Sequence, residues 1–482
     1  MVADTETPVG AACKLIEPGR GDFLLESVEG GEVRGRYSLL GLDPDLLFRA
    51  DRDRVEVFRH WQSDRSAGEP IGGGGLAALR ALAAECRIEV PEELPPALAC
   101  LVGYFGYETI SLVERLPRAP DSALGLPDMV FVRPTLILVF DRLNDVLFVI
   151  APLWPGGRDP ADQVAAAGER IDAALARLAS AAPRRARAAA LPAMSLEPAM
   201  TRAEYFGMVA RAKEYIAAGD IFQVVLAQRF TCAFPLPPLE LYRALRRVNP
   251  SPFLYFLDLP GFAVVGSSPE ILVRVRPDPA GGMAVTIRPI AGTRPRGATR
   301  QEDEANEASL LADAKERAEH LMLLDLGRND VGRVAARGTV EVTDSFTIER
   351  YSHVMHIVSN VVGRLDPAHD ALDALFAGFP AGTVSGAPKI RACEIIAELE
   401  PETRGAYAGG VGYFAPDGSV DSCIVLRTGV VRDGVLHVQA GAGIVADSEP
   451  DYEYRECEAK AGALLAAARE AARIAQEPDF GQ

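Results

Sequence analysis

Short β-rich runs, set among separated helices, most constrain the fold of this chain. Residues 136–140 and 146–150 are rich in β-branched and aromatic side chains, and the polar segment 141–145 between them is typical of a turn. Together they predict an antiparallel hairpin. The chain shows no regular alternation of strand, helix and strand. These patterns favour an α+β fold built on large antiparallel β-sheets.

Hydrophobic periodicity predicts several further elements in the second half of the chain. Residues 222–230 and 262–265 have the composition of strands, and residues 205–217 have helical spacing. Residues 306–324 and 452–475 are rich in Ala, Leu, Glu and Arg, so each is predicted to form one long helix.

A segment of low sequence complexity divides the chain in two. Residues 181–198 mix Ala, Arg and Pro without a sustained apolar face, which predicts a connector. The connector would separate an N-terminal part, residues 1–180, from a C-terminal part, residues 199–475.

Composition and charge exclude several classes of protein. Hydrophobic residues make up 48% of the 482 residues, enough for a sizeable core. A net charge of −17 disfavours nucleic acid and anionic membrane surfaces as partners. No apolar run approaches the roughly 20 residues of a membrane helix. Seven scattered cysteines and an acidic start without the pattern of a signal peptide predict reduced thiols and a cytoplasmic location.

Two pairs of glutamates have a spacing that suits metal binding. Glu316 and Glu319 lie three residues apart on one predicted helix, as do Glu453 and Glu456 on another, where Lys460 follows. Residues at this spacing share a helix face, and two such faces could surround Mg²⁺ with oxygen ligands. The spacing alone leaves open that Glu456 and Lys460 form an ordinary surface ion pair.

Glycine-rich turns are predicted at 289–297, 381–389 and 439–444, and they could present main-chain amides to an anion. The last follows the predicted strand 435–438, so we expect a turn there whose amides face a cleft, with Arg427 and Lys460 supplying positive charge. None of the three matches a phosphate loop or a dinucleotide fingerprint, which excludes a nucleotide site, but each is also compatible with a simple tight turn.

Two residues are candidates for proton transfer. Glu270 follows Ser-Ser-Pro at a predicted strand end, and His353 lies in a largely apolar stretch of a chain that has only six histidines. The residue types alone do not separate a catalytic histidine from a structural one.

These segments, taken together, resemble the family of chorismate-utilising enzymes, which includes anthranilate, aminodeoxychorismate, isochorismate and salicylate synthases. The N-terminal half is similar to the family more loosely, through residues 24–27, 36–41 and 103–107. The matching segments of the C-terminal half occur in the family's order at residues 219–229, 266–270, 318–330, 407–413 and 453–460. The resemblance implies large antiparallel sheets packed around a substrate cleft, with flanking helices.

Two positions distinguish the members of the family. Isochorismate and salicylate synthases carry a lysine that activates water where this chain has Gln223, and glutamine has no titratable group. Aminodeoxychorismate synthases commonly carry a nucleophilic lysine where this chain has Ala291. Both differences favour the anthranilate synthase reaction, in which ammonia displaces the ring hydroxyl of chorismate and pyruvate is lost. The alternatives are an aminodeoxychorismate synthase large subunit and a non-catalytic tryptophan sensor.

The resemblance also implies roles for individual residues. Glu270 would protonate the leaving hydroxyl and would need a raised pKa, while His353 and Thr293 would line the ring. His353 would assist either the departure of the hydroxyl or the later loss of the ring proton. The Mg²⁺ ligands would be Glu316, Glu319, Glu453 and Glu456. The enolpyruvyl carboxylate would be held by Tyr407, Arg427, Lys460 and the amides of Gly441 and Gly443.

Partners and regulation are implied in the same way. The family obtains ammonia from a glutaminase, and no Gly-x-Cys-x-Gly elbow occurs in this chain, so a separate glutaminase subunit and a hetero-oligomer are expected. Two segments resemble the family's tryptophan feedback site, in which a serine hydroxyl and a carboxylate would hold the ammonium group. Phe253 and Leu254 stand where some members have Tyr and Met, and packing alone could also explain both segments. The residues expected there are Leu25, Glu26, Ser27, Pro252, Phe253 and Leu254.

Overall fold

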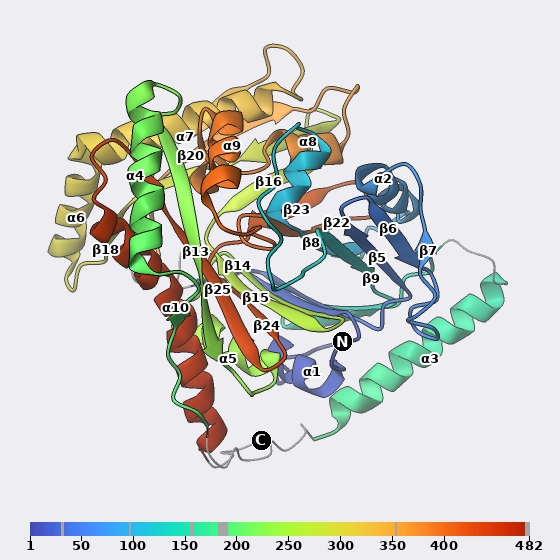
Figure 1. Cartoon of the computed structure of the whole chain (residues 1–482). Helices are drawn as coiled ribbons and strands as arrows, with labels where there is room; N and C mark the ends of the chain where they lie inside the picture. The colour runs from blue at the N-terminus through green and yellow to red at the C-terminus, as the bar shows by residue number, and fades with distance from the viewer. Residues whose placement is uncertain (30–32, 96–97, 155–158, 182–190, 352–353, 478–482) are drawn as a thin grey trace.

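Two large antiparallel β-sheets packed face to face form the centre of the molecule (Figure 1). The structure is a computed structural model and describes residues 1–29, 33–95, 98–154, 159–181, 191–351 and 354–477. The predicted α+β class with large antiparallel sheets is confirmed.

The first sheet runs in the order β11-β10-β4-β1-β14-β15-β24-β25-β13-β12, with β21 paired to β13. Its strands are β1 (Asp22–Glu26), β4 (Tyr37–Leu42), β10 (Leu136–Asp141), β11 (Val146–Ile150), β12 (Glu197–Pro198), β13 (Gln223–Ala233), β14 (Phe253–Leu259), β15 (Phe262–Ser268), β21 (Gly386–Ala387), β24 (Thr428–Arg432) and β25 (Val435–Ile444).

The second sheet runs in the order β18-β20-β17-β16-β23-β22-β8-β9-β5-β6-β7, with β19 paired to β20. A separate short pair joins β2 (Val28–Glu29) to β3 (Val33–Arg34). The strands of the second sheet are β5 (Leu46–Asp51), β6 (Arg54–Phe58), β7 (Glu69–Pro70), β8 (Leu101–Phe105), β9 (Met129–Arg133), β16 (Ile271–Pro277), β17 (Met283–Ile287), β18 (Ile290–Pro295), β19 (Glu341–Arg350), β20 (Val354–Arg364), β22 (Gly410–Phe414) and β23 (Val420–Ile424).

Helices cover the outer faces of both sheets (Figure 1). The long α10 packs on β25 and on α5, whereas α7 packs on β18 and β20 of the other sheet. The helices are α1 (Pro8–Leu15), α2 (Gly75–Glu85), α3 (Pro160–Ala179), α4 (Arg202–Ala218), α5 (Pro238–Val248), α6 (Arg300–Ala312), α7 (Ala314–Gly332), α8 (Ala371–Ala377), α9 (Lys389–Leu399) and α10 (Pro450–Gln476), with two 3₁₀ turns at Tyr107–Leu112 and Gly382–Val384.

The core between the sheets follows from strand alternation, because every second side chain of a strand points to the same face. Phe23, Tyr255 and Val264 of the first sheet are buried against Val102 and Val130 of the second. Burial on both faces of these central strands explains why they are almost continuously apolar in the sequence.

Most predicted elements are confirmed, and three are wrong. The hairpin of 136–140 and 146–150 exists as β10 and β11, with Ile137 opposite Ile150. The predicted single helix 306–324 is two helices, because Asp313 ends α6 and caps α7 by accepting hydrogen bonds from the amides of Lys315 and Glu316. The turns expected at 289–297 and 439–444 are instead strand, since Ile290–Pro295 forms β18 and β25 continues through Ile444.

Both halves of the chain contribute strands to both sheets. β1 of the N-terminal part pairs with β14 of the C-terminal part, and β8 pairs with β22 in the second sheet. Much of the predicted connector falls at residues 182–190, outside the described residues. Among the residues that the structure describes, no helix is both long and apolar enough to span a bilayer.

Candidate active site

Two neighbouring crossovers between the sheets carry Glu270 and Arg427. Glu270 lies in the segment that joins β15 of the first sheet to β16 of the second, and Arg427 lies where the chain returns from β23 to β24. The two segments are hydrogen-bonded to each other: the Ile424 amide donates to the Glu270 carbonyl over 3.1 Å, and the Ser267 amide donates to the Arg427 carbonyl over 3.2 Å. The sheet sandwich therefore holds a carboxylic acid and a guanidinium side by side.

The Glu270 carboxyl is buried, with 6% of the residue exposed. Burial raises the pKa of Glu270 to about 8, although the Thr383 hydroxyl and the Arg427 guanidinium favour its ionised form. A carboxyl in this state keeps its proton at neutral pH and can act as an acid.

Arg427 occupies an unusual backbone position, with φ +48°. Its guanidinium makes no hydrogen bond or ion pair with the residues that the structure describes, and burial lowers its pKa. A guanidinium with free donors beside a neutral acid is suited to binding a carboxylate of a ligand.

One edge of β25 is open where its glycines lie. β25 pairs with β24 only as far as Val438, while its other edge stays paired with β13 through Ile444. The carbonyl of Gly441 accepts a hydrogen bond from Lys460 Nζ over 2.8 Å, so the peptide groups of Gly441 point to the open edge. Gly443, two residues further along the strand, points the same way. The expected pair of amides is thus presented by a strand edge rather than by a turn.

Side chains above these glycines explain why no larger residue fits. A Cβ on Gly441 would come within 2.8 Å of the Tyr407 hydroxyl, and a Cβ on Gly443 within 2.7 Å of the Gln223 amide nitrogen. Burial raises the pKa of Tyr407, so its hydroxyl keeps its proton and remains a donor. Tyr407, Lys460 and the two glycines therefore lie together.

The predicted carboxylate pairs come from opposite sides of the cleft. Glu316 and Glu319 lie in the first two turns of α7, and Glu453 and Glu456 lie in the first two turns of α10. Burial raises the pKa of Glu319, and the neighbouring carboxylates Glu316 and Glu456 raise it further. Burial, assisted by Glu456, also raises the pKa of Glu453. Carboxylates that destabilise one another's charge form a donor set suited to a hard cation.

The four glutamates do not close around one point. Within the described ranges, no three Asp, Glu, His or Cys side chains lie close enough to hold a single metal ion. Two nearby cations take part of their charge: Arg294 lies 3.2 Å from Glu316 Oε1, and Lys460 lies 2.7 Å from Glu456 Oε1.

Another histidine, absent from the sequence prediction, lies beside Thr293. His353 falls outside the described residues, whereas His356 of β20 is buried, with its Nδ1 3.2 Å from the Thr293 hydroxyl and 2.8 Å from the carbonyl of Gly292. A carbonyl can only accept, so Nδ1 carries the proton and Nε2 is left as the basic nitrogen. Burial lowers the pKa of His356, which keeps the imidazole neutral.

A cavity of about 850 Å³ lies between the sheets and is lined by all six residues of the predicted tryptophan site. It also reaches Pro269 and Ile271, the two neighbours of Glu270. The wall of this cavity and the acid therefore share one short segment.

Glu26 does not have the role expected of it in that site. Its carboxylate accepts hydrogen bonds from Tyr242 at 2.7 Å, from Arg246 at 2.8 and 2.9 Å, and from Arg142 at 2.5 Å. Both oxygens are used by these donors, and strand alternation turns the side chain towards α5, so the carboxylate is not available to an ammonium group. Leu25 and Ser27, on either side, remain partly exposed.

Comparison with known proteins identifies the family. Residues 39–466 match the family described as chorismate binding enzyme. The chain belongs to this family. Anthranilate synthase component 1 of Cereibacter sphaeroides is 53% identical over all of this chain and 96% of its own length, and that of Thermus thermophilus is 46% identical over 97% and 96%.

Solved structures of chorismate-binding enzymes share the fold. The crystal structure of anthranilate synthase component I from Streptococcus pneumoniae superposes with a TM-score of 0.79 at 37% identity, covering 89% of this chain and 92% of that one. A menaquinone-specific isochorismate synthase from Escherichia coli has a TM-score of 0.69 at 21% identity over 96% and 92%, which shows the fold alone. Within its family, this chain groups with the anthranilate synthase large subunits.

Proposed function

We propose that the chain converts chorismate and ammonia into anthranilate and pyruvate, as the large subunit of an anthranilate synthase. The observation that carries the proposal is the buried, protonated Glu270 beside the unpaired guanidinium of Arg427. The full-length relatives named anthranilate synthase component 1 support this choice of reaction. Gln223 and Ala291 support it as well, since neither can act as the base or the nucleophile of the related reactions.

Glu270 is the acid of the proposed mechanism. Its carboxyl proton passes to the ring hydroxyl of chorismate as the C–O bond breaks, while ammonia forms a C–N bond two carbons away. Because the neutral carboxyl is already the favoured state of the buried site, no prior protonation step is required at neutral pH.

The enolpyruvyl carboxylate is held by Arg427, Tyr407 and Lys460, together with the amides of Gly441 and Gly443. Two N–H groups of a guanidinium can bind a carboxylate in parallel, which orients the ring as well as binding it. Lys460 already lies at Gly441, so its charge is next to the carboxylate.

His356, with Thr293, lines the ring; the role predicted for His353 concerns a residue outside the described ones. The Nε2 of His356 accepts the proton of the carbon that carries the new amine, as the ring C–O bond breaks and enolpyruvate leaves, which takes up a proton to become pyruvate. Its neutral state and its tautomer, set by the Gly292 carbonyl, support this role.

Glu316, Glu319, Glu453 and Glu456 would hold Mg²⁺, which when bound offsets the charge of the ring carboxylate. The oxygen-only donors and the raised pKa of Glu319 and Glu453 fit such an ion. Lys460 and Arg294 would have to release part of the charge that they now neutralise.

A glutamine amidotransferase subunit supplies ammonia in this proposal, in a cytoplasmic hetero-oligomer. The name component 1 of the relatives supports a second component. Tryptophan inhibits by filling the 850 Å³ cavity, where Phe253 and Leu254 meet the indole and Ser27 the ammonium group. Contact with Pro269 and Ile271 gives the inhibitor a direct path to the acid between them.

Product analysis tests the proposed reaction. The purified chain is incubated with chorismate, Mg²⁺ and excess ammonium at mildly alkaline pH, and the products are separated and identified. Anthranilate with an equal amount of pyruvate is the expected result. An aminated, non-aromatic product without pyruvate would indicate an aminodeoxychorismate synthase, and unchanged chorismate would leave only a tryptophan sensor.

A further inference from the structure

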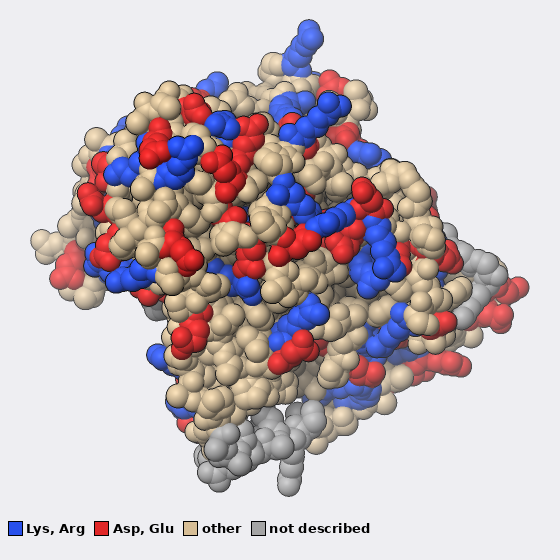
Figure 2. Space-filling model, in the orientation of Figure 1, with Lys and Arg blue, Asp and Glu red and all other residues tan. Residues whose placement is uncertain are grey.

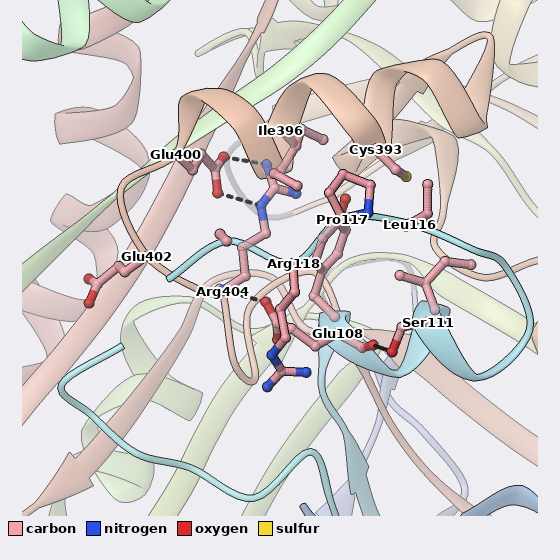
Figure 3. Close-up of a pocket in the computed structure, with 14 residues that line it drawn as sticks. Glu108, Ser111, Leu116, Pro117, Arg118, Cys393, Ile396, Glu400, Glu402 and Arg404 are labelled. Atoms are coloured by element: carbon pink, nitrogen blue, oxygen red, sulfur yellow. Dashed lines mark hydrogen bonds and ion pairs between the residues drawn. The ribbon is translucent and has the colours of Figure 1, made fainter. Parts of the chain in front are cut away.

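The guanidinium of Arg404 is buried beneath α9, where it pairs with Glu400 (Figure 3). Its side chain is 1% exposed and pairs with Glu400 through Nε at 2.8 Å and Nη2 at 2.5 Å. The remaining donors reach two main-chain carbonyls: Nη1 donates to Val384 over 2.7 Å and Nη2 donates to Val225 over 2.8 Å. A single side chain thus connects α9, the 3₁₀ turn at 382–384 and β13.

The contacts to β13 lie directly behind the glycines of the carboxylate pocket. In the ladder between β13 and β25, Val225 is opposite Gly443 and Ala227 is opposite Gly441. Within the described ranges, the outer edge of β13 pairs with β21 only as far as Val224, although the Val225 amide still donates to the Ser385 carbonyl over 2.8 Å. Arg404 takes the Val225 carbonyl, and Glu400 accepts a hydrogen bond from the Ala227 amide over 2.8 Å. The ion pair therefore does for this edge what a neighbouring strand would do.

The segment after Arg404 leads to Tyr407. The buried carboxyl of Glu108 accepts hydrogen bonds from the amides of Arg404 and Gly405, over 2.7 and 3.0 Å. The Arg404 guanidinium then stacks near the rings of Tyr107 and Tyr407, with its carbon 4.6 and 5.5 Å from the ring centroids. Glu108 thereby fixes the main chain that leads to Tyr407, and the Arg404 guanidinium contacts the Tyr407 ring.

A third contact reaches the acid. Val384 follows Thr383, whose hydroxyl is near enough to Glu270 to lower the pKa of its carboxyl but is buried without a hydrogen bond to any described residue. The hydrogen bond from Arg404 to the Val384 carbonyl therefore sets the position of that threonine relative to β13.

We propose that Arg404 is a positioning residue, which sets the carboxylate pocket and the acid at a fixed separation by binding β13, the turn at Val384 and the Tyr407 segment at once. Only a guanidinium has enough donors in a fixed plane to do this. A lysine at the same place has one nitrogen, which cannot reach Glu400 and both carbonyls together. The inference rests on the proposed binding of a chorismate carboxylate by Gly441, Gly443 and Tyr407.

The test compares Arg404→Lys and Arg404→Met with the matched control Arg229→Met. Arg229 lies on β13, the strand that Arg404 contacts, and makes a similar two-pronged pair with Glu402, at 2.8 and 3.0 Å. Among the described residues it donates to no carbonyl of the cleft wall. The kcat and KM for chorismate are measured with ammonia as the nitrogen source, below the melting range of each variant. Arg404→Lys is expected to lower kcat/KM about 100-fold, with a higher KM, because small misplacements of binding groups are costly. Arg229→Met should leave KM unchanged.

An Arg404→Lys variant with the same KM and kcat as Arg229→Met would overturn the positioning role. If neither Arg404 variant folds, Glu108→Gln gives the answer with the guanidinium still in place, since its single carbonyl oxygen cannot serve both amides. A higher KM for chorismate in Glu108→Gln is then expected, and an unchanged KM would overturn the proposal.

Gly443→Ala distinguishes a failure of the positioning role of Arg404 from a failure of the proposed carboxylate binding on which it rests. An unchanged KM for chorismate in Gly443→Ala would contradict the proposal that this pocket binds the carboxylate. A raised KM in Gly443→Ala, together with an Arg404→Lys variant that behaves like the control, would support the carboxylate pocket and contradict only the positioning role of Arg404.

Discussion

Glu270 and Arg427 lie on the two adjacent crossovers between the sheets, and the Ser267 amide ties one crossover to the other through the Arg427 carbonyl at 3.2 Å. An acid that must be neutral and a cation that must stay unpaired are usually incompatible neighbours, because the two would form a salt bridge. Burial of Glu270 prevents this by raising its pKa. The guanidinium is left for a ligand.

Glu270→Gln should reduce kcat by about 10²- to 10⁴-fold, because glutamine keeps the size of the side chain but has no proton to transfer. Anthranilate fluorescence with saturating chorismate and ammonia measures the effect. Asp258→Asn is the control, since Asp258 is another buried carboxyl whose pKa is raised, to about 6, and its hydrogen-bond partner is the Gly19 amide. Equal activities of the two variants would contradict the acid role.

Arg427→Lys should raise the KM for chorismate by about 10- to 100-fold, since a charge-assisted, two-pronged contact is reduced to a single one. Arg432→Lys provides the control. Arg432 is the last residue of β24, the strand that Arg427 directly precedes, but it donates to the Leu124 carbonyl. Steady-state kinetics at several chorismate concentrations distinguish the two. A larger effect on kcat than on KM would contradict the assignment of Arg427 to binding the chorismate carboxylate.

Removal of Mg²⁺ with a chelator should abolish activity, and Glu319→Gln should weaken binding of the ion. Titration calorimetry with Mg²⁺ in the absence of chorismate gives a readout that does not depend on catalysis. Glu458→Gln changes an exposed glutamate of α10 and should bind Mg²⁺ as the unchanged chain does. Identical affinities of the two variants would show that the ion does not use Glu319.

Phe253→Ala should weaken inhibition by tryptophan without changing kcat, because Phe253 lines the large cavity and is only partly buried. The affinity for tryptophan is measured by calorimetry, and the rate is measured with and without tryptophan. Leu143→Ala, at a side chain that is 72% exposed, is the control. Inhibition that survives unchanged in Phe253→Ala would move the regulatory site away from this cavity.

Local pattern predicted much of the fold and of the site. Alternation and turn residues located the hairpin of β10 and β11, and helical spacing placed Glu316 and Glu319, like Glu453 and Glu456, on single faces. The electrostatic coupling of Glu319 to Glu456 is a long-range consequence of packing, but helical spacing already indicated which side chains could meet.

The residues that were misjudged or missed depend on contacts between segments far apart in the sequence. Glu26 has the appearance of a free carboxylate until α5 brings Arg246 to it from 220 residues away. His356 was not predicted because the local sequence does not show the register of β20 against β18, which brings its Nδ1 to Gly292. Arg404 was missed because an Arg four residues after a Glu is common on surfaces, and no local feature shows that this pair is buried.

Charge offered less information than the motifs did. On the face shown in Figure 2, acidic and basic side chains are interspersed, although the chain carries a net charge of −17. The cations that matter for the proposed chemistry, Arg427 and Lys460, lie at the cleft and have little effect on that total. Net charge therefore excluded polyanionic partners without identifying the small anion that the family binds.

The pH dependence of kcat/KM for chorismate tests the central claim most directly, because it reports the ionisation of the free enzyme. With a folded-state pKa of about 8, above the ordinary carboxyl value of 4.5, Glu270 is protonated below pH 8 and loses its proton above it. Between those two values the folded chain binds the extra proton, so this group's contribution to stability also falls as pH rises. At a constant concentration of unprotonated ammonia, kcat/KM should fall as pH rises through about 8, and Glu270→Gln should lose this limb. A profile that stays level through pH 8 in the unchanged chain would contradict the assignment of Glu270 as the acid.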